Sequence, residues 1–133
     1  MVSFVSYRER SEVASDASTL AEHLRKIQVS ASAVEVPTGC SGVKNFTVKM
    51  AGSSLITDVT CAVGSVTDVS NLRLSLQNSV FSFAYQVVFD SRTVSATPLD
   101  IYICGNDRSY KISVSALANI SEPELIEGEC SII

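Results

Sequence analysis

The sequence predicts a mainly β (α+β) fold: an antiparallel β-sandwich or jelly-roll-like barrel of about seven strands, with one N-terminal amphipathic helix. Two observations predict it. Residues 7–28 are rich in charge and carry apolar residues at helical spacing, whereas residues 29–118 form short runs that alternate apolar and polar residues. No helical periodicity separates these runs, and parallel strands would need crossover helices. We therefore expect antiparallel pairing.

The chain has 133 residues, the length of a single domain. Its hydrophobic content of 46% is enough for one core that depends on neither metals nor disulfides. We divide residues 1–133 into a helix (7–28), a β domain (29–118) and an acidic and apolar C-terminal tail (119–133).

The predicted helix carries one apolar stripe with spacings of four, three, four and three residues. Ser11 is expected to be its N-cap, and His23, Arg25 and Lys26 are expected near its C-terminal end, where cations suit the helix dipole. The stripe packs either on the sheet or on a neighbouring subunit. Its members are Val13, Ala17, Leu20, Leu24 and Ile27.

Among the predicted strands, residues 80–90 show the clearest alternation. They would place Phe81, Phe83, Tyr85 and Phe89 on one buried face, and on that basis Phe83→Ser would impair folding. A short helical turn is expected within residues 117–128. The other predicted strands are residues 44–50, 55–63, 72–76, 99–103 and 110–116, with a weaker candidate at 28–36.

The charge is balanced over most of the chain. Ten basic and ten acidic residues lie before Glu122, and the remaining four acids, all in the tail, give the net charge of −4. Nucleic-acid binders cluster Lys and Arg, so nucleic acid is disfavoured as a partner. With 22 serines and only 18% charged residues, the surface tolerates close approach of a second copy. This favours a homo-oligomer.

The N-terminus has neither the basic region nor the apolar run of a signal peptide, and no stretch reaches the ~20 apolar residues of a membrane span. We therefore expect a cytoplasmic protein without a transmembrane segment. Cys40, Cys61, Cys104 and Cys130 show no zinc or redox spacing, and a cytoplasmic location favours free thiols. No metal or other cofactor is expected.

Few residues qualify as a catalytic site. His23 is the only histidine, and Cys40, which lies between two glycines, is its only candidate partner for a Cys/His enzyme. A solvated histidine at a helix end is the simpler interpretation. The carboxylates are dispersed, and two matches to the glycosylation pattern, starting at Asn45 and Asn119, are interpreted as chance in a cytoplasmic protein.

These observations favour a non-enzymatic, self-associating structural or assembly protein, for which a virus-type shell or accessory subunit is a fold-level analogy. The alternative is a protein-binding adaptor that uses a sheet edge or the acidic C-terminal tail. A Cys/His enzyme and a nucleic-acid binder rank lower. The candidate interface consists of the helix stripe (Val13, Ala17, Leu20, Leu24 and Ile27) and four apolar tail residues (Leu125, Ile126, Ile132 and Ile133).

Overall fold

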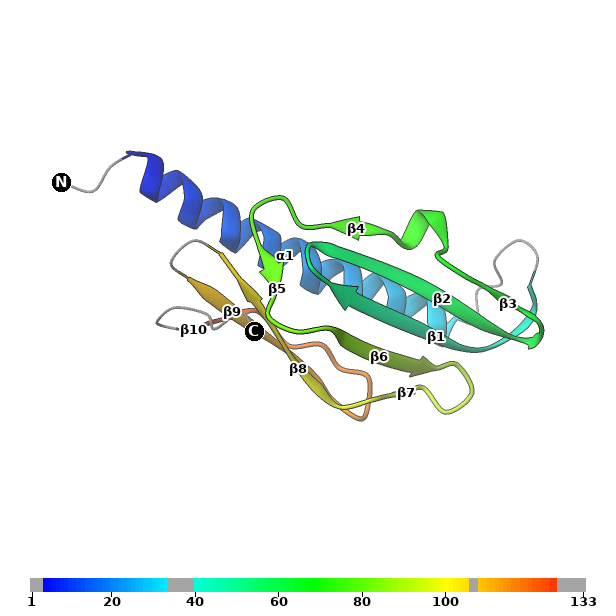
Figure 1. Cartoon of the computed structure of the whole chain (residues 1–133). Helices are drawn as coiled ribbons and strands as arrows, with labels where there is room; N and C mark the ends of the chain where they lie inside the picture. The colour runs from blue at the N-terminus through cyan, green and yellow to red at the C-terminus, as the bar shows by residue number, and fades with distance from the viewer. Residues whose placement is uncertain (1–3, 34–39, 106–107, 127–133) are drawn as a thin grey trace.

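The computed structural model describes residues 4–33, 40–105 and 108–126, and it describes side-chain burial in the helix from Glu12 onward. These residues form one N-terminal helix and two antiparallel sheets, which confirms the predicted mainly β sandwich with one helix (Figure 1). The elements are α1 (Phe4–Ser32), β1 (Ser41–Ala51), β2 (Ser54–Val63), β3 (Ser65–Val66), a 3-10 turn (Ser70–Leu72), β4 (Leu74–Ser75), β5 (Val80–Phe81), β6 (Tyr85–Asp90), β7 (Ser95–Ala96), β8 (Leu99–Cys104), β9 (Ser109–Val114) and β10 (Glu124–Ile126).

The larger sheet has the strand order β3-β2-β1-β6-β7, with β4 paired to the other end of β2. The β1–β2 hairpin forms its centre and turns at Gly52, whose φ of 59° lies in the left-handed region that glycine adopts without strain. The smaller sheet has the order β10-β9-β8-β5. Alternate residues of both sheets are buried, as the sequence pattern predicted.

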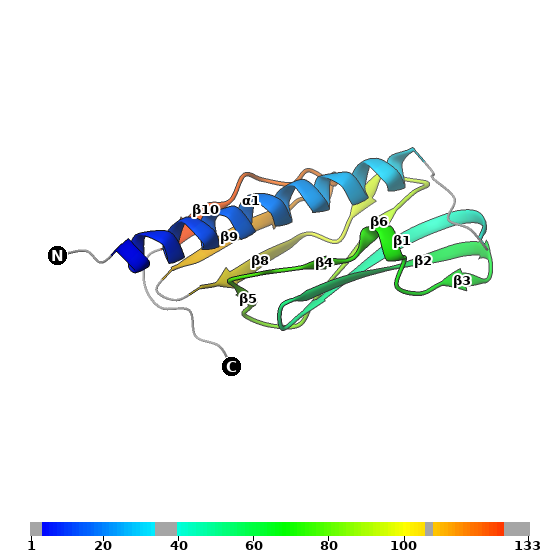
Figure 2. The same ribbon diagram turned by 90° about the horizontal axis from the view of Figure 1, so that it is seen from above.

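Helix α1 runs along the sheets and contacts β9, β6 and β1, so it bridges the two of them (Figure 2). All five members of the predicted stripe are buried, and Leu20, Leu24 and Ile27 are fully so. Four of them, Ala17, Leu20, Leu24 and Ile27, form one hydrophobic core with the inner faces of both sheets. The burial of apolar surface from α1 and from both sheets holds these three parts of the fold together.

The helix is longer than the sequence predicted. It begins at Phe4, so Ser11 lies within it and is not its N-cap. It ends at Ser32, so residues 28–32 are helical rather than part of a strand, and His23, Arg25 and Lys26 lie before its last turn. The cause of the C-terminal extension is packing: Ala31 is buried and continues the stripe by one more turn.

The N-terminal turns of α1 extend beyond the β domain. Both views show this end of the helix running past the nearest strands, while the remainder lies against the sheets (Figures 1 and 2). Within the part of the helix whose burial is described, the core residues begin at Val13.

The predicted strand over residues 80–90 is instead two strands in different sheets. β5 pairs with β8 in the smaller sheet, whereas β6 pairs with β1 in the larger one. The chain crosses between them at residues 82–84. There the Ser82 N–H donates to the Tyr102 carbonyl, and the Tyr85 hydroxyl accepts from the Tyr102 N–H at 3.2 Å. These tertiary hydrogen bonds override the local alternation.

This crossing moves Phe83 out of the core. Its side chain is 50% exposed and meets Tyr85 only edge-to-face, with ring centroids 6.2 Å apart. The expected burial of Phe83, from which we predicted that Phe83→Ser impairs folding, is therefore wrong. We expect the substitution to change the free energy of unfolding by less than about 1 kcal/mol, measured by urea denaturation. A loss of several kcal/mol would contradict this placement.

Three other expectations are corrected. Residues 70–72 form a 3-10 turn, so the strand is limited to Leu74 and Ser75 of β4, which pair with the start of β2. Val63, which the alternation over residues 55–63 would place on the buried side of the strand, is exposed at the end of β2. Within 117–128, residues 124–126 form β10 rather than a helical turn, since they pair with β9 and place Glu124 within 3.3 Å of the Lys111 ammonium.

Candidate functional site

The proposed Cys/His pair does not exist, because both partners are engaged elsewhere. Cys40 forms a disulfide with Cys61, so it has no thiol to act as a nucleophile. The side chain of His23 on α1 is half-buried, and its Nε2 is 2.7 Å from the Leu72 carbonyl oxygen. Because a carbonyl only accepts, Nε2 must carry the hydrogen. His23 thus ties α1 to the 3-10 turn, rather than serving as a solvated cation.

The environment of His23 lowers its pKa from 6.5. Burial is the main cause, the hydrogen bond to the Leu72 carbonyl opposes it, and the nearby Lys26 ammonium adds to the lowering. The unfolded chain therefore binds a proton at a higher pH than the folded chain does. It follows that stability falls as the pH drops below about 6.5, until the folded-state pKa is reached.

His23→Gln tests this assignment because glutamine retains an N–H donor but cannot titrate. We expect the wild type to lose stability relative to the variant as the pH is lowered from about 7.5 to about 5, and the difference to be constant above pH 7.5. Urea denaturation at each pH gives this difference. Parallel curves for the two proteins would show that His23 is not the titrating group.

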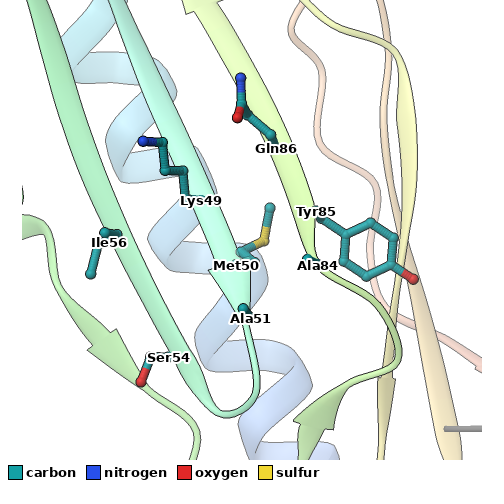
Figure 3. Close-up of a pocket in the computed structure, with 8 residues that line it drawn as sticks. All are labelled: Lys49, Met50, Ala51, Ser54, Ile56, Ala84, Tyr85 and Gln86. Atoms are coloured by element: carbon teal, nitrogen blue, oxygen red, sulfur yellow. The ribbon is translucent and has the colours of Figure 1, made fainter. Parts of the chain in front are cut away.

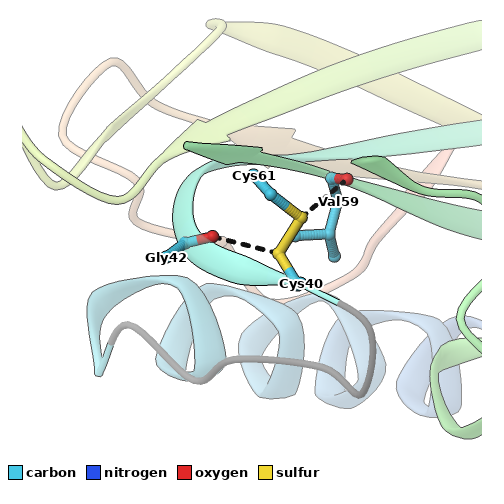
Figure 4. The surroundings of a disulfide bond; sticks show 4 residues. All are labelled: Cys40, Gly42, Val59 and Cys61. Carbon is cyan, nitrogen blue, oxygen red and sulfur yellow. Dashed lines mark hydrogen bonds between the residues drawn. A yellow bond between two sulfur atoms is a disulfide. The ribbon is translucent and has the colours of Figure 1, made fainter. Parts of the chain in front are cut away.

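The Cys40–Cys61 disulfide joins the start of β1 to β2, with the two Cα atoms 5.6 Å apart (Figure 4). Cys61 lies opposite Val43 in the hairpin register, which brings the two cysteines into the range where a bridge forms. Sulfur–carbonyl approaches to Gly42 and Val59 measure 3.0 and 3.9 Å. Since a disulfide sulfur has no hydrogen, these are contacts rather than hydrogen bonds.

The expectation of free thiols is therefore wrong for the cysteines that the structure describes. Cys104, buried at the end of β8, is also disulfide-bonded. Cys130 lies outside the described residues. The sequence showed only that four cysteines were widely spaced, and the pairing became visible only once the hairpin register brought Cys40 opposite β2.

The candidate interface residues fall into three groups. Val13, Ala17, Leu20, Leu24 and Ile27 are buried against the sheets of the same chain, so the stripe is core and not a dimerising face. Leu125 is 44% exposed and Ile126 is half-buried on β10. Ile132 and Ile133 lie outside the described residues. Because β10 pairs with β9, residues 124–126 close their own sheet.

The sheet edges offer little room for an added strand. The outer side of β2 is covered by β3 at one end, by β4 at the other, and between them by the Val69 N–H bound to the Thr57 carbonyl. The edge strands β3, β5 and β7 are two residues long, and β10 is three. Short edges of this kind protect a sheet from pairing with other chains.

A shallow groove of about 360 Å³ lies at the β1–β2 hairpin and the start of β6 (Figure 3). Sequence reasoning did not identify it, since its lining comes from three segments that only the fold brings together. The Lys49 ammonium there is 2.9 Å from Asp58, and the Tyr85 hydroxyl is bonded to Ser82. The lining residues are Lys49, Met50, Ala51, Ser54, Ile56, Ala84, Tyr85 and Gln86.

The carboxylates act locally and do not converge on a cation. The pKa of Asp58 is lowered, first by the Asp68 N–H that donates to it and then by Lys49. The pKa of Asp90 is lowered by the N–H groups of Arg92 and Thr93, as in a turn that an aspartate stabilises. Asp107 lies outside the described residues, and among those described there is no cluster suited to a metal ion.

One buried carboxylate, Asp16, has a structural role that the sequence did not reveal. It accepts hydrogen bonds from the Asn78 N–H at 2.7 Å, the Ser79 hydroxyl at 2.8 Å and the Gln77 N–H at 3.3 Å. The segment between β4 and β5 is thereby fixed to α1.

Within the described residues, no helix combines the length and the apolar content that spanning a membrane requires. The chain matches no protein-family model, and comparisons with curated proteins and with solved structures find no match.

Proposed function

We propose that this protein is a non-enzymatic, self-associating structural or assembly subunit, in which the N-terminal turns of α1 pack against a second copy. The observation that carries the proposal is the projection of α1 beyond the β domain (Figures 1 and 2). A helix of 29 residues is about 43 Å long, and its described core contacts begin only at Val13.

A projecting helical segment is unfavourable for an isolated chain. Short helices are marginal in water, and most helical stability in proteins comes from packing. Residues 4–12 extend roughly 13 Å along the axis and precede Val13, which is the first core residue in the part of the helix whose burial is described. Packing on another protein would supply the stabilisation that the chain's own sheets supply farther along the helix.

The composition of this segment favours a second copy as the partner. It contains two bases, Arg8 and Arg10, and two acids, Glu9 and Glu12, so its net charge is zero. Two copies of this segment would therefore meet without net repulsion. The sequence of the same segment also contains the apolar residues Phe4, Val5 and Tyr7.

The adaptor alternative keeps one supporting observation. Leu125 is an exposed apolar residue on β10, whose outer side is a sheet edge. This edge is three residues long and its Glu124 is paired with Lys111. It therefore offers less to a partner than the projecting helix does, and self-association ranks first.

The disulfides alter the expected location. A Cys40–Cys61 bridge and a disulfide-bonded Cys104 favour an oxidising compartment, where such bonds persist, over the cytoplasm that the sequence predicted. An assembly exposed to such an environment gains stability from these bridges.

Light scattering coupled to gel filtration tests self-association over a range of concentrations. We expect the full chain to form oligomers that dissociate on dilution, and deletion of residues 1–10 to give a monomer. The deletion removes none of the described core residues, so the thermal unfolding temperature of the monomeric β domain should change little.

Val63→Ser is the matched control, because Val63 is 74% exposed at the end of β2 and is not part of the N-terminal segment that the deletion removes. This variant should oligomerise like the wild type. A full chain that stays monomeric at the highest concentration would refute self-association. Oligomers that persist after the deletion would place the interface elsewhere, with β10 as the next surface to test.

A further inference from the structure

We propose that Asn119, and not Asn45, is an acceptor site for N-linked glycosylation. Both residues begin an Asn-x-Ser/Thr pattern, at residues 119–121 and 45–47. In the cytoplasm such matches carry no meaning. The disulfides at Cys40–Cys61 and Cys104 favour an oxidising compartment, which is where this modification also takes place in secreted proteins.

Asn119 lies on the surface, in the connection between β9 and β10. Its backbone holds a turn: its N–H donates to the Ser115 hydroxyl at 3.1 Å, and its carbonyl accepts from the Ser115 N–H at 2.9 Å. Within the described residues, its exposed side-chain amide makes no hydrogen bond. A sugar on that nitrogen would therefore break no contact of the fold.

The neighbourhood of Asn119 has room for a large polar group. Leu117 is 76% exposed, and Ser121 and Glu122 are exposed on the other side. A glycan over Leu117 would also cover one of the largest exposed apolar side chains of the described surface.

Asn45 presents the opposite situation. It lies within β1, a central strand, with Thr60 of β2 on one side and Asp90 of β6 on the other. Its side chain is half-buried, its Oδ1 lies 3.4 Å from the Thr47 hydroxyl, and the next residue, Phe46, is in the core. A glycan there would have to displace the half-buried side chains of Thr60 and Asp90, which lie opposite Asn45 on the two neighbouring strands.

The transfer needs only a glycosyl donor of the lipid phosphate-linked oligosaccharide class and a transferase. The Asn119 side-chain nitrogen forms a bond to C1 of the sugar while the bond from C1 to the phosphate oxygen breaks. The lipid phosphate leaves, and a base of the transferase takes one amide proton. In the folded chain the Ser121 hydroxyl accepts from the Ser113 N–H at 2.8 Å. We therefore infer that transfer to Asn119 takes place while this segment is undocked from β9, after β1 has paired with β2 and β6 and placed Asn45 between them.

Cell-free translation with microsomes tests the proposal, using the full chain behind a cleavable secretory leader. Modification is read as an endoglycosidase-sensitive mobility shift, and peptide mapping identifies the site. We expect one glycan on the wild type, Asn45→Gln and Ser121→Thr, and none on Asn119→Gln or Ser121→Ala. Ser121→Thr keeps the hydroxyl that the pattern requires, and Ser121→Ala removes it. Comparison of these two variants separates the hydroxyl requirement from a structural effect of replacing Ser121.

An unmodified wild-type chain, in a reaction that glycosylates a standard acceptor protein, would overturn the proposal. A glycan at Asn45, alone or together with Asn119, would overturn the selection between the two sites.

Discussion

Asp16→Ala is expected to lower the free energy of unfolding by about 3 kcal/mol, measured by urea denaturation. The carboxylate is only 7% exposed, and it accepts from the Asn78 N–H, the Gln77 N–H and the Ser79 hydroxyl. Hydrogen bonds to a charged acceptor are the stronger kind. Alanine would remove all of them and leave the donors beside a helix that cannot satisfy them.

Two further variants test whether burial and the number of hydrogen-bond donors explain the loss of stability in Asp16→Ala. Asp16→Asn keeps the shape and one acceptor oxygen, so it should lose less stability than Asp16→Ala. Asp100→Ala removes an exposed carboxylate that accepts only from the Ser113 hydroxyl at 2.7 Å, and it should have a small effect. Equal losses for Asp16→Ala and Asp100→Ala would show that burial and the number of donors do not determine the contribution of Asp16.

The sequence predicted the buried positions that recur at regular intervals along a helix or strand. The stripe from Val13 to Ile27 is buried as expected, and so are the inward residues of the strands around Phe46, Ile101 and Ile112. These positions recur at intervals that one face of a helix or strand must satisfy, so the pattern is visible in one dimension.

Features that depend on contacts between distant segments were missed. The alternation over residues 80–90 continues through the point where the chain changes sheet, because Tyr102, which fixes the crossing, lies outside that run. The helix start was placed at Ser11 because a serine before a stripe resembles a cap, although propensity alone carries little weight.

In the candidate site, too, the sequence identified single residues but not their contacts with distant segments. His23 was identified as the one histidine, yet its partner is a backbone carbonyl, and backbone carbonyls leave no mark in a sequence. Asp16 could have been noticed as an acid beside Ala17 on the buried side of the helix, but its three donors lie more than 60 residues away. The Cys40–Cys61 disulfide leaves no mark in the sequence either, because only the β1–β2 register brings these two cysteines together.

Gly105→Ala is expected to destabilise the protein by about 2 to 3 kcal/mol, because the new methyl group has no space. Gly105 follows β8 where that strand meets α1. A Cβ placed on it would overlap one methyl of Val13, lie 2.8 Å from the other and 3.0 Å from the Val13 Cβ. Val13 is itself buried, so it cannot move aside into solvent. Thermal and urea unfolding of the variant measure the loss.

Val13→Ala tests the cause, since it removes both overlapping methyl groups and leaves only the tight approach of the two Cβ atoms. The double variant should be less destabilised than the sum of the two single variants, by about 1 to 2 kcal/mol. Strict additivity would mean that the effect of Gly105→Ala comes from the backbone conformation at residue 105 and not from the close approach to α1.

Val13 is also the first described core residue of the helix. Loosening this contact should therefore free the projecting turns, and the Gly105→Ala chain should form weaker oligomers at equal concentration than Val63→Ser does.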